Sequence, residues 1–332
     1  MGLDLAIKNG TIVDGSGGPR YRADIGIQNG KIVEVGRIHS HANEVIDAEG
    51  KVVAPGFIDG HTHMDAQVFW DPIGSCSCYH GVTSVIMGNC GFTLAPCAKE
   101  NADYVFKNLE RAEDISRDAM LEGIDWTWET FPEFLDVVDG LPKGINYGGY
   151  IGHSALRTYV MGEKAFEAEA SDDELKVMKQ LVKEAVSAGE IGFSTSRTFN
   201  HATADDRPVA SRLANWDEVR AIVNALGETG KGMFELAGEA PGRDPDAVRE
   251  YHCRLRDLAI ESGVTQTWGL FANRSAPEYW HAYADLLDET AAAGGRMFAQ
   301  VHSRGLNTLL SFESNLPFDS WEHWKDFRAL PL

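Results

Sequence analysis

The sequence is poor in cysteine and in positive charge, and it has no long apolar run. Five cysteines are a sparse, odd number for 332 residues, so we expect reduced thiols in the cytoplasm rather than a disulfide framework. Its 30 Lys and Arg against 50 Asp and Glu give a net charge of −20, which does not suit binding to nucleic acid or to an anionic membrane. No stretch approaches the roughly 18 apolar residues of a membrane span. Met1–Val13, which contains Asp4 and Lys8, does not resemble a signal peptide.

What remains is an ordinary globular composition. Apolar residues make up 43% of the chain and charged residues 24%, and the length is sufficient to bury a large core. Residues 1–54 contain only short β-type runs. Two pairs in this region, Asn9-Gly10 and Asn29-Gly30, each predict a two-residue hairpin turn, because both positions of such a turn need positive φ. We therefore expect a small β layer at the start of the chain.

From Pro55-Gly56 onward, short apolar runs alternate with long amphipathic segments. This alternation predicts a parallel sheet covered by helices, and its repeat number favours a (β/α)₈ TIM-type barrel over residues 55–332. No eighth strand is evident after His302, so the barrel is either incomplete or has its last strand hidden in the tail. The seven expected strands are Phe57–His63, Thr83–Gly88, Ile145–Ile151, Ile191–Ser196, Met233–Leu236, Thr265–Leu270 and Met297–His302.

Helix signals separate these strands. Ser171 and Glu174 have the spacing of a capping box, and Gly189 suits the position that follows a helix. Between strands two and three, the insertion Tyr104–Phe134 is rich in aromatic residues and is expected to form a lid or one wall of a pocket. Further helices are expected at Trp216–Glu228, Asp246–Glu261 and Pro277–Ala293.

Residues that can bind a metal gather where the expected strands end, which is the active-site face of such a barrel. His61 and His63 are two positions apart, so both imidazoles are expected on one side of the first strand. Convergent histidines suit zinc or a similar divalent metal. Cys90 follows the second strand, where a thiolate beside a metal acts as a ligand. The later strand ends add His153, Ser194, Glu235, His302 and Arg304.

Four segments resemble a known family. They are Pro55–His63, Gly81–Gly91, Gly152–Arg157 and Gly192–Ser196. The first, a His-x-His pair after Pro-Gly-Phe-Ile-Asp, resembles the first barrel strand of the amidohydrolase superfamily. The others, with Gly-Asn-Cys-Gly in the second, look like its N-acyl-D-amino-acid deacylase branch. The resemblance extends over about residues 3–200 and becomes thin afterwards.

This resemblance implies a metal-dependent hydrolase of linear, non-peptide C–N amide bonds, with an N-acyl (D-)amino acid as its small-molecule substrate. His61, His63 and Cys90 would bind Zn²⁺ or another divalent metal. His153 and Arg157 would lie near the substrate. In the family, the first ~55 residues also form part of a small β-sandwich beside the barrel. From the residues themselves, we expect Ser194 and Arg304 at the substrate, the latter because a guanidinium suits a carboxylate.

The chain departs from the family pattern at three positions. The family has histidine ligands on strands five and six, where this chain offers Glu235 and nothing comparable. It also has an aspartate after strand eight that moves a proton, whereas no Asp-Gly pair follows His302. We therefore predict that Glu235 or His302 takes the acid–base role.

Two alternatives stay open. A cyclic amidase of the hydantoinase or dihydropyrimidinase type uses similar metal chemistry, but usually with a lysine ligand that strand four lacks. A degenerate barrel that has lost ligands would serve in binding or assembly, and metal content would separate it from an enzyme. The sequence also leaves a homo-oligomer open.

Overall fold

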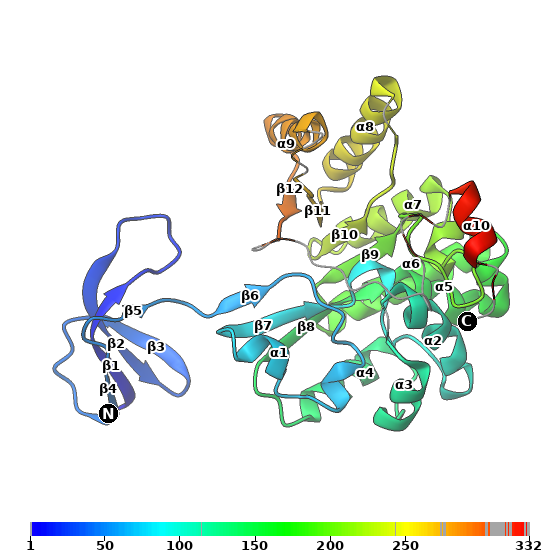
Figure 1. The fold of residues 1–332 in the computed structure, drawn as a ribbon. Helices are drawn as coiled ribbons and strands as arrows, with labels where there is room; N and C mark the ends of the chain where they lie inside the picture. The colour runs from blue at the N-terminus through cyan, green and yellow to red at the C-terminus, as the bar shows by residue number, and fades with distance from the viewer. Residues whose placement is uncertain are drawn as a thin grey trace.

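The computed structural model describes residues 2–113, 115–242, 244–272, 274, 277–302, 305, 316, 318, 321–328 and 330. They form a five-stranded sheet at the N-terminus and a seven-stranded parallel sheet with helices, joined through the segment between β5 and β6 (Figure 1). The helices of these residues are α1 (Ser75–Cys78), α2 (Ala102–Ala112), α3 (Arg117–Gly123), α4 (Phe131–Gly140), α5 (His153–Met161), α6 (Asp172–Ala188), α7 (Trp216–Gly227), α8 (Pro245–Ser262), α9 (Pro277–Ala292) and α10 (Glu322–Arg328).

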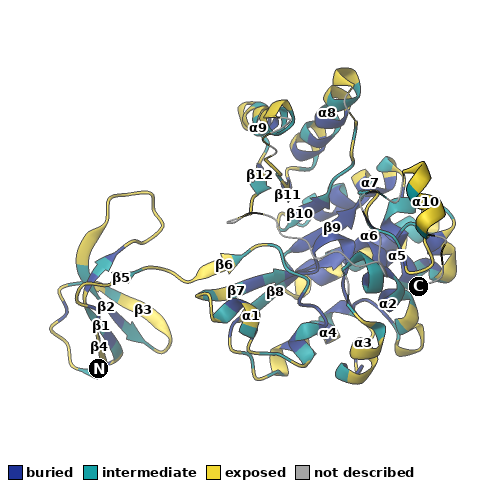
Figure 2. Cartoon of the chain, viewed as in Figure 1, coloured by how far each residue is buried: buried dark blue, intermediate teal, exposed yellow. Residues whose placement is uncertain are grey.

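The N-terminal sheet is mixed, because β1 pairs antiparallel with β2 and parallel with β4 and β5. Its order is β3-β2-β1-β4, with β5 paired to the far end of β1. Leu3, Ala6 and Ile38 form its small core, while much of β3 and β4 is exposed (Figure 2). Its strands are β1 (Leu3–Ile12), β2 (Tyr21–Gln28), β3 (Lys31–Gly36), β4 (Ala42–Asp47) and β5 (Val52–Val53).

One of the two predicted hairpin turns is confirmed and the other is wrong. Asn29 and Gly30 both have positive φ and connect β2 to β3. Asn9-Gly10 instead lies inside the continuous strand β1, at an irregularity in its pairing with β2. The chain does not reverse there because β1 goes on to pair with β5. Gly10 is needed for that approach, since a Cβ at this position would lie 2.6 Å from Val53 Cγ2.

All seven predicted barrel strands are present and follow one another in chain order, each parallel to its neighbour. Helices α5, α6 and α7 pack against β9, and the central strands are buried on both faces (Figure 2). Most boundaries agree to within one residue, and the two larger differences are that β6 ends before His61 and β12 ends before His302. The strands are β6 (Phe57–Asp59), β7 (Val82–Met87), β8 (Asn146–Gly152), β9 (Gly192–Ser196), β10 (Met233–Ala237), β11 (Thr265–Gly269) and β12 (Met297–Gln300).

The parallel sheet is an open half-barrel. Strand β6 pairs only with β7 and β12 only with β11, so within the described part of the chain no eighth strand joins the two edges. Both edges carry exposed apolar side chains, with Phe57 and Ile58 on one side and Phe298 and Val301 on the other. A cavity of about 740 Å³ lies between these edges.

The insertion between β7 and β8 contains α2 and α3 and leads into α4. Trp126 stacks on Trp128, with ring centroids 4.6 Å apart, and Trp128 contacts Phe134 at 5.2 Å. Both tryptophans and Phe134 belong to the main core. The insertion is thus built into the body of the half-barrel and is not a loose lid.

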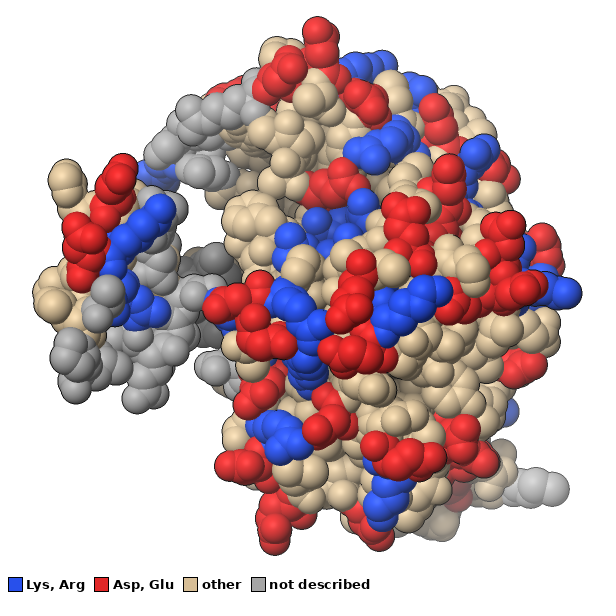
Figure 3. Space-filling view, turned by 90° about the vertical axis from the view of Figure 1, so that its right-hand side faces the viewer, with Lys and Arg blue, Asp and Glu red and all other residues tan. Residues whose placement is uncertain are grey.

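Charged side chains cover the surface with both signs interspersed. On the face drawn in Figure 3, Lys and Arg lie among Asp and Glu, so the net charge of −20 is not gathered there into one acidic patch. Within the ranges that the structure describes, no helix has the length and apolarity needed to cross a membrane.

Helix α6 forms as its sequence predicts. The Ser171 hydroxyl accepts a hydrogen bond from the Glu174 N–H, and the Glu174 carboxylate accepts one from the Ser171 N–H, which together form the predicted capping box. At the other end, Gly189 follows with a φ of 122°. Met178, Val182 and Val186 are buried along the inner face of the helix.

We expect Ser171→Ala to lower the free energy of unfolding by about 1 kcal/mol, because the first turn loses a capping acceptor. Ser187→Ala is the matched control in the same helix, since that exposed hydroxyl only bonds back to the Lys183 carbonyl. The control should be neutral or slightly stabilising. Urea unfolding measures both, and equal effects of the two substitutions would contradict this role for the cap.

Candidate metal centre

Three predicted ligands converge at the carboxyl end of the half-barrel. His61 and His63 lie in the segment that leaves β6, with ring centroids 5.3 Å apart. The Cys90 thiol, which follows β7, is 3.4 Å from His61 Nε2. One ligand atom from each of the three side chains lies within 4.8 Å of the others. The Thr62 N–H donates to the Ile86 carbonyl at 2.9 Å and so holds the two histidines beside β7.

Cys90 is held in an uncommon backbone conformation. Its φ of 58° is left-handed, which usually costs a non-glycine residue about 1–3 kcal/mol. The Cys90 N–H donates to Glu235 Oε2 at 2.7 Å, and the Gly91 N–H donates to Ser194 Oγ at 2.9 Å. Gly88 is required beside it, because a Cβ there would lie 2.3 Å from the Tyr150 carbonyl. The turn therefore presents the thiol because two neighbouring strands hold its backbone.

The His61 ring is oriented by residues from distant strands. Gln300, at the end of β12, lies with its Oε1 2.7 Å from His61 Nδ1. Glu235 Oε1 is 3.7 Å from the same nitrogen. A hydrogen bond at Nδ1 leaves Nε2 free to bind a metal, which is how imidazole ligands are usually held. Gln300 was not among the predicted site residues, and it also links the two open edges of the half-barrel.

Two further residues complete the cluster, and neither was predicted as a ligand. Glu113 follows α2, and its Oε2 lies 3.1 Å from His63 Nε2. His201 follows β9, and its Nε2 lies 3.8 Å from Glu113 Oε1. Cys90, Glu113 and His201 form a second set of donors within 4.8 Å of one another. His201 lies five residues beyond the end of β9, as strand-end ligands do, whereas no local sequence signal points to Glu113.

Burial shifts the ionisation of the whole cluster toward uncharged forms. It raises the pKa of Glu235 to about 8. Burial and the negative charges of Asp65 and Glu235 raise the pKa of Glu113 to about 8 as well. Burial, with Glu235 and Glu113, also raises the pKa of the Cys90 thiol well above its usual range. The same desolvation lowers the pKa of His61 and, more strongly, of His63.

These donors fit a bound cation. A divalent metal among them would favour the ionised thiolate and carboxylates and the neutral imidazoles, reversing the effect of burial on the acids. Within the described residues, His63 Nδ1, Glu113 Oε1 and Glu235 Oε1 are buried and make no hydrogen bond. Sulfur, imidazole nitrogen and carboxylate oxygen are the ligand types that zinc accepts.

His153, Arg157 and Ser194 do not face this cluster. All three side chains are fully buried. His153 Nε2 and the Arg157 guanidinium both contact Glu218, at 2.9 and 2.6 Å, and Ser194 holds the turn at Cys90. The hydrogen bonds that these side chains make are all to groups inside the protein, and their predicted substrate contacts stay predictions.

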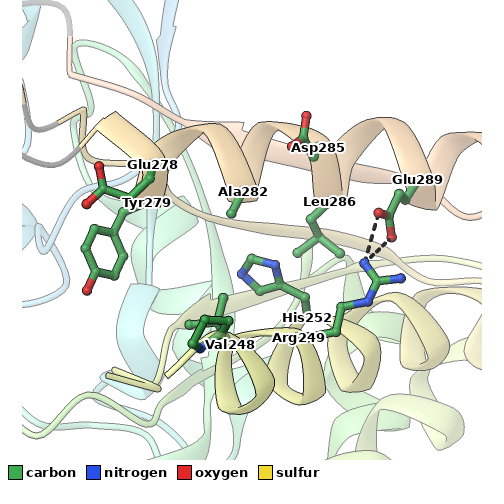
Figure 4. Close-up of a pocket in the computed structure, with 10 residues that line it drawn as sticks. Val248, Arg249, His252, Glu278, Tyr279, Ala282, Asp285, Leu286 and Glu289 are labelled. Atoms are coloured by element: carbon green, nitrogen blue, oxygen red, sulfur yellow. Dashed lines mark hydrogen bonds and ion pairs between the residues drawn. The ribbon is translucent and has the colours of Figure 1, made fainter. Parts of the chain in front are cut away.

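His302 is exposed beside the cluster, 5.3 Å from the Phe271 ring between centroids, and both line the cavity between β6 and β12 together with His61. Arg304 lies outside the described residues. A separate cavity of about 550 Å³ lies between α8 and α9, closed on one side by the Arg249–Glu289 ion pair (Figure 4). It contains none of the cluster residues, so we do not assign the chemistry to it.

Comparison with known proteins identifies the family. A model of the amidohydrolase family matches residues 44–312. The chain belongs to the amidohydrolase family. The predicted membership and the predicted TIM-type barrel fold are thereby confirmed.

Among its relatives is a D-aminoacylase of Alcaligenes xylosoxydans xylosoxydans, 34% identical over 241 residues, which cover 68% of this chain and 47% of the relative. An uncharacterized Mycobacterium tuberculosis protein is 35% identical over 182 residues, which cover 52% of this chain and 29% of that protein. A D-aminoacylase crystal structure matches with a TM-score of 0.72 and 25% identity, covering 91% of this chain and 59% of that one. This amidohydrolase thus spans less than half the length of the curated relatives named here.

The Glu218 network yields a prediction about stability. Burial alone would raise the pKa of Glu218, but the hydrogen bond from His153 and the charge of Arg157 outweigh it and lower the pKa to about 2. Because Glu218 is buried, we expect Glu218→Gln to cost about 3–5 kcal/mol at neutral pH by leaving Arg157 without its counter-ion. The pKa of Glu218 is lower in the folded protein than its unfolded value of about 4.5, so its ionisation stabilises the fold fully at pH values above about 4.5. The cost should therefore shrink as pH falls toward 2.

Urea unfolding at several pH values measures this cost. Glu261→Gln is the matched control, since Glu261 pairs with Arg220 on the surface at 2.8 Å and should change stability little. A loss for Glu218→Gln that does not vary with pH would contradict the electrostatic origin.

Proposed function

We propose that this amidohydrolase is a metal-dependent enzyme that removes the acyl group from an N-acyl-D-amino acid. The observation that carries the proposal is the convergence of His61, His63 and Cys90 at the carboxyl end of a parallel half-barrel. Family membership and similarity to D-aminoacylases support the linear amide as the bond cleaved. The zinc or other divalent metal is also part of the proposal; a solved D-aminoacylase, 26% identical, is described as having a binuclear metal centre.

The three ligands would hold the cation through two imidazole nitrogens and one thiolate. When bound, such a cation lowers the pKa of a water molecule and polarises the scissile carbonyl. The residues around it supply orientation. Gln300 keeps His61 Nε2 directed at the thiol, and Glu235 and Ser194 keep the Cys90 turn in place.

Glu235 is the proposed acid–base group. Its Oε2 accepts the Cys90 N–H, while its Oε1 makes no hydrogen bond within the described residues and lies 3.7 Å from His61. Burial favours the protonated form of Glu235 and a nearby cation would favour the ionised form, and an acid–base group must use both forms. His302 is more exposed and lines the cavity, so we assign it to substrate contact beside Phe271.

We expect His61→Ala and Cys90→Ala to lose metal measured by elemental analysis of the non-chelated protein. Release of free amine from N-acyl-D-amino acids should fall by more than about 10³-fold, because the cation stabilises the transition state by several kcal/mol. N-acyl-L-amino acids, hydantoin and dihydrouracil complete the substrate panel. His281→Ala, an exposed histidine on α9, is the control and should keep both metal and activity.

The outcomes separate the alternatives. Faster turnover of the cyclic amides would favour the hydantoinase hypothesis. Metal without hydrolysis of any of these amides would favour a non-catalytic barrel. A wild-type protein that folds but binds no metal would contradict the metal-dependent function altogether.

A second prediction tests Glu235. The amide of Glu235→Gln can still accept the Cys90 N–H, so metal content should be unchanged while kcat falls by about 10²–10⁴-fold. Glu190→Gln is the matched control, because Glu190 is equally buried but lies at the amino end of β9, away from the cluster. If both variants lose activity to the same extent, Glu235 has no specific role.

A further inference from the structure

The cavity of about 550 Å³ between α8 and α9 has the size of a ligand pocket. Val248 from α8, with Ala282 and Leu286 from α9, gives it an apolar wall (Figure 4). Its lining extends along α9 from Glu278 to Glu289, which is roughly 16 Å at the rise of an α-helix. The space between the two helices is therefore elongated and largely apolar.

The parallel sheet separates this cavity from the candidate metal centre. Thr267 on β11 is paired in register with Glu235, so its side chain lies on the face of the sheet that holds the Cys90 turn. Trp268, the next residue, points to the opposite face, where its ring lies 5.0 Å from that of Tyr283 on α9 between centroids. The cavity thus belongs to the helical layer outside the half-barrel.

A buried polar atom at this cavity has no partner in the protein. His252 lines the cavity from α8, and its side chain is only 5% exposed. Its Nε2 is buried and makes no hydrogen bond within the described residues. Figure 4 shows the ring between the two helices, beside Ala282 and Leu286. Because an unpaired buried polar atom costs free energy, it favours a ligand that brings a hydrogen-bonding group.

The layer beneath the cavity has the same character. The Tyr283 ring packs against His252, with centroids 4.5 Å apart, and against Trp268 on its other side. Trp268 Nε1 and both amide atoms of Gln266, two residues earlier on the same face of β11, are also buried without a hydrogen bond in the part of the chain that is described. Native proteins leave few such atoms unpaired, so their grouping beside one cavity indicates a binding site.

The charges at the cavity determine the sign of the ligand. The lining contains three acids, Glu278, Asp285 and Glu289, and one base, Arg249. Arg249 is paired with Glu289 at 2.9 Å, so the charge that remains is negative. Burial and the charge of Arg249 lower the pKa of His252 and favour its neutral ring. A neutral imidazole nitrogen can accept a hydrogen bond from an ammonium group.

We propose that the cavity between α8 and α9 binds an elongated apolar amine. The ammonium group donates to His252 Nε2 in the field of the surrounding carboxylates, and the hydrocarbon body packs against Val248, Ala282 and Leu286. This site is separate from the one proposed for hydrolysis, and it uses neither a metal nor any residue of the candidate centre.

Three probes with a common hydrocarbon body test the sign of the ligand. They are phenylbutylamine, phenylbutanol and phenylbutanoate, which are cationic, neutral and anionic at neutral pH. Isothermal titration calorimetry of the full chain should give a Kd for the amine at least about tenfold lower than for the alcohol or the acid.

Substitutions in the cavity test the location. His252→Leu removes the acceptor and should raise the Kd of the amine by about tenfold. Ala282→Trp fills the space and should abolish binding. His61→Ala, at the candidate metal centre, should bind the amine as the wild type does. Circular dichroism verifies that each variant is folded, and a variant that unfolds is replaced by His252→Gln or Ala282→Phe.

A further pair of variants tests the carboxylates. Glu278→Gln combined with Asp285→Asn should reduce the preference for the amine over the alcohol to about twofold, because the attraction between opposite charges is lost. Asp288→Asn is the matched control, since Asp288 is an exposed acid of α9 outside the cavity lining, and it should keep the full preference.

Several results would overturn the inference. They are no binding of the amine to the wild type, equal or tighter binding of the alcohol or the acid, and undiminished binding in Ala282→Trp. Loss of amine binding in His61→Ala would place the ligand at the candidate metal centre instead. Hydrolysis is not a readout in any of these experiments, so failure of the proposed function would leave their outcome unchanged.

Discussion

The arrangement of the candidate centre depends on the turn Asn89–Gly91. Cys90 has a left-handed backbone there, and a free chain would not hold a non-glycine residue in that conformation. The buried Glu235 and Ser194 side chains stabilise it by accepting the N–H groups of Cys90 and Gly91. Because these acceptors come from β10 and β9, the position of the thiol depends on correct pairing of the sheet. The paired strands therefore position the thiol of the donor set.

The Gln300–His61 contact also connects the two edges of the sheet, β6 and β12, across the opening between them. Parallel strands normally close a barrel through backbone hydrogen bonds, but among the described residues these two edges make none with each other. A side-chain hydrogen bond of 2.7 Å instead connects the last strand to the first imidazole. The orientation of His61 is consequently sensitive to any movement of β12 relative to β6. The exposed side chains along both edges leave this contact reachable from the cavity.

The sequence predicts those features that depend on local patterns and on the ends of strands. Apolar runs between amphipathic segments identified the seven strands, and the His-x-His pair and Cys90 were placed together because parallel strands end on one face. Glu113 could not be found in this way, since it follows a helix and reaches the cluster only through packing of the insertion. Asn9-Gly10 was misassigned because the same two residues suit a hairpin or a strand irregularity, and pairing with β5 decides between them. The burial of Arg157 depends on Glu218, which is 61 residues away.

The Glu235 carboxylate has a structural part in the centre. It is fully buried and accepts the Cys90 N–H at 2.7 Å. Glu235 therefore helps to hold the Cys90 turn in place. Glu113 and His201 reach the same thiol from the segments after α2 and β9. The scaffold constrains where a thiol and two histidines meet, while the surrounding segments determine which further donors reach them.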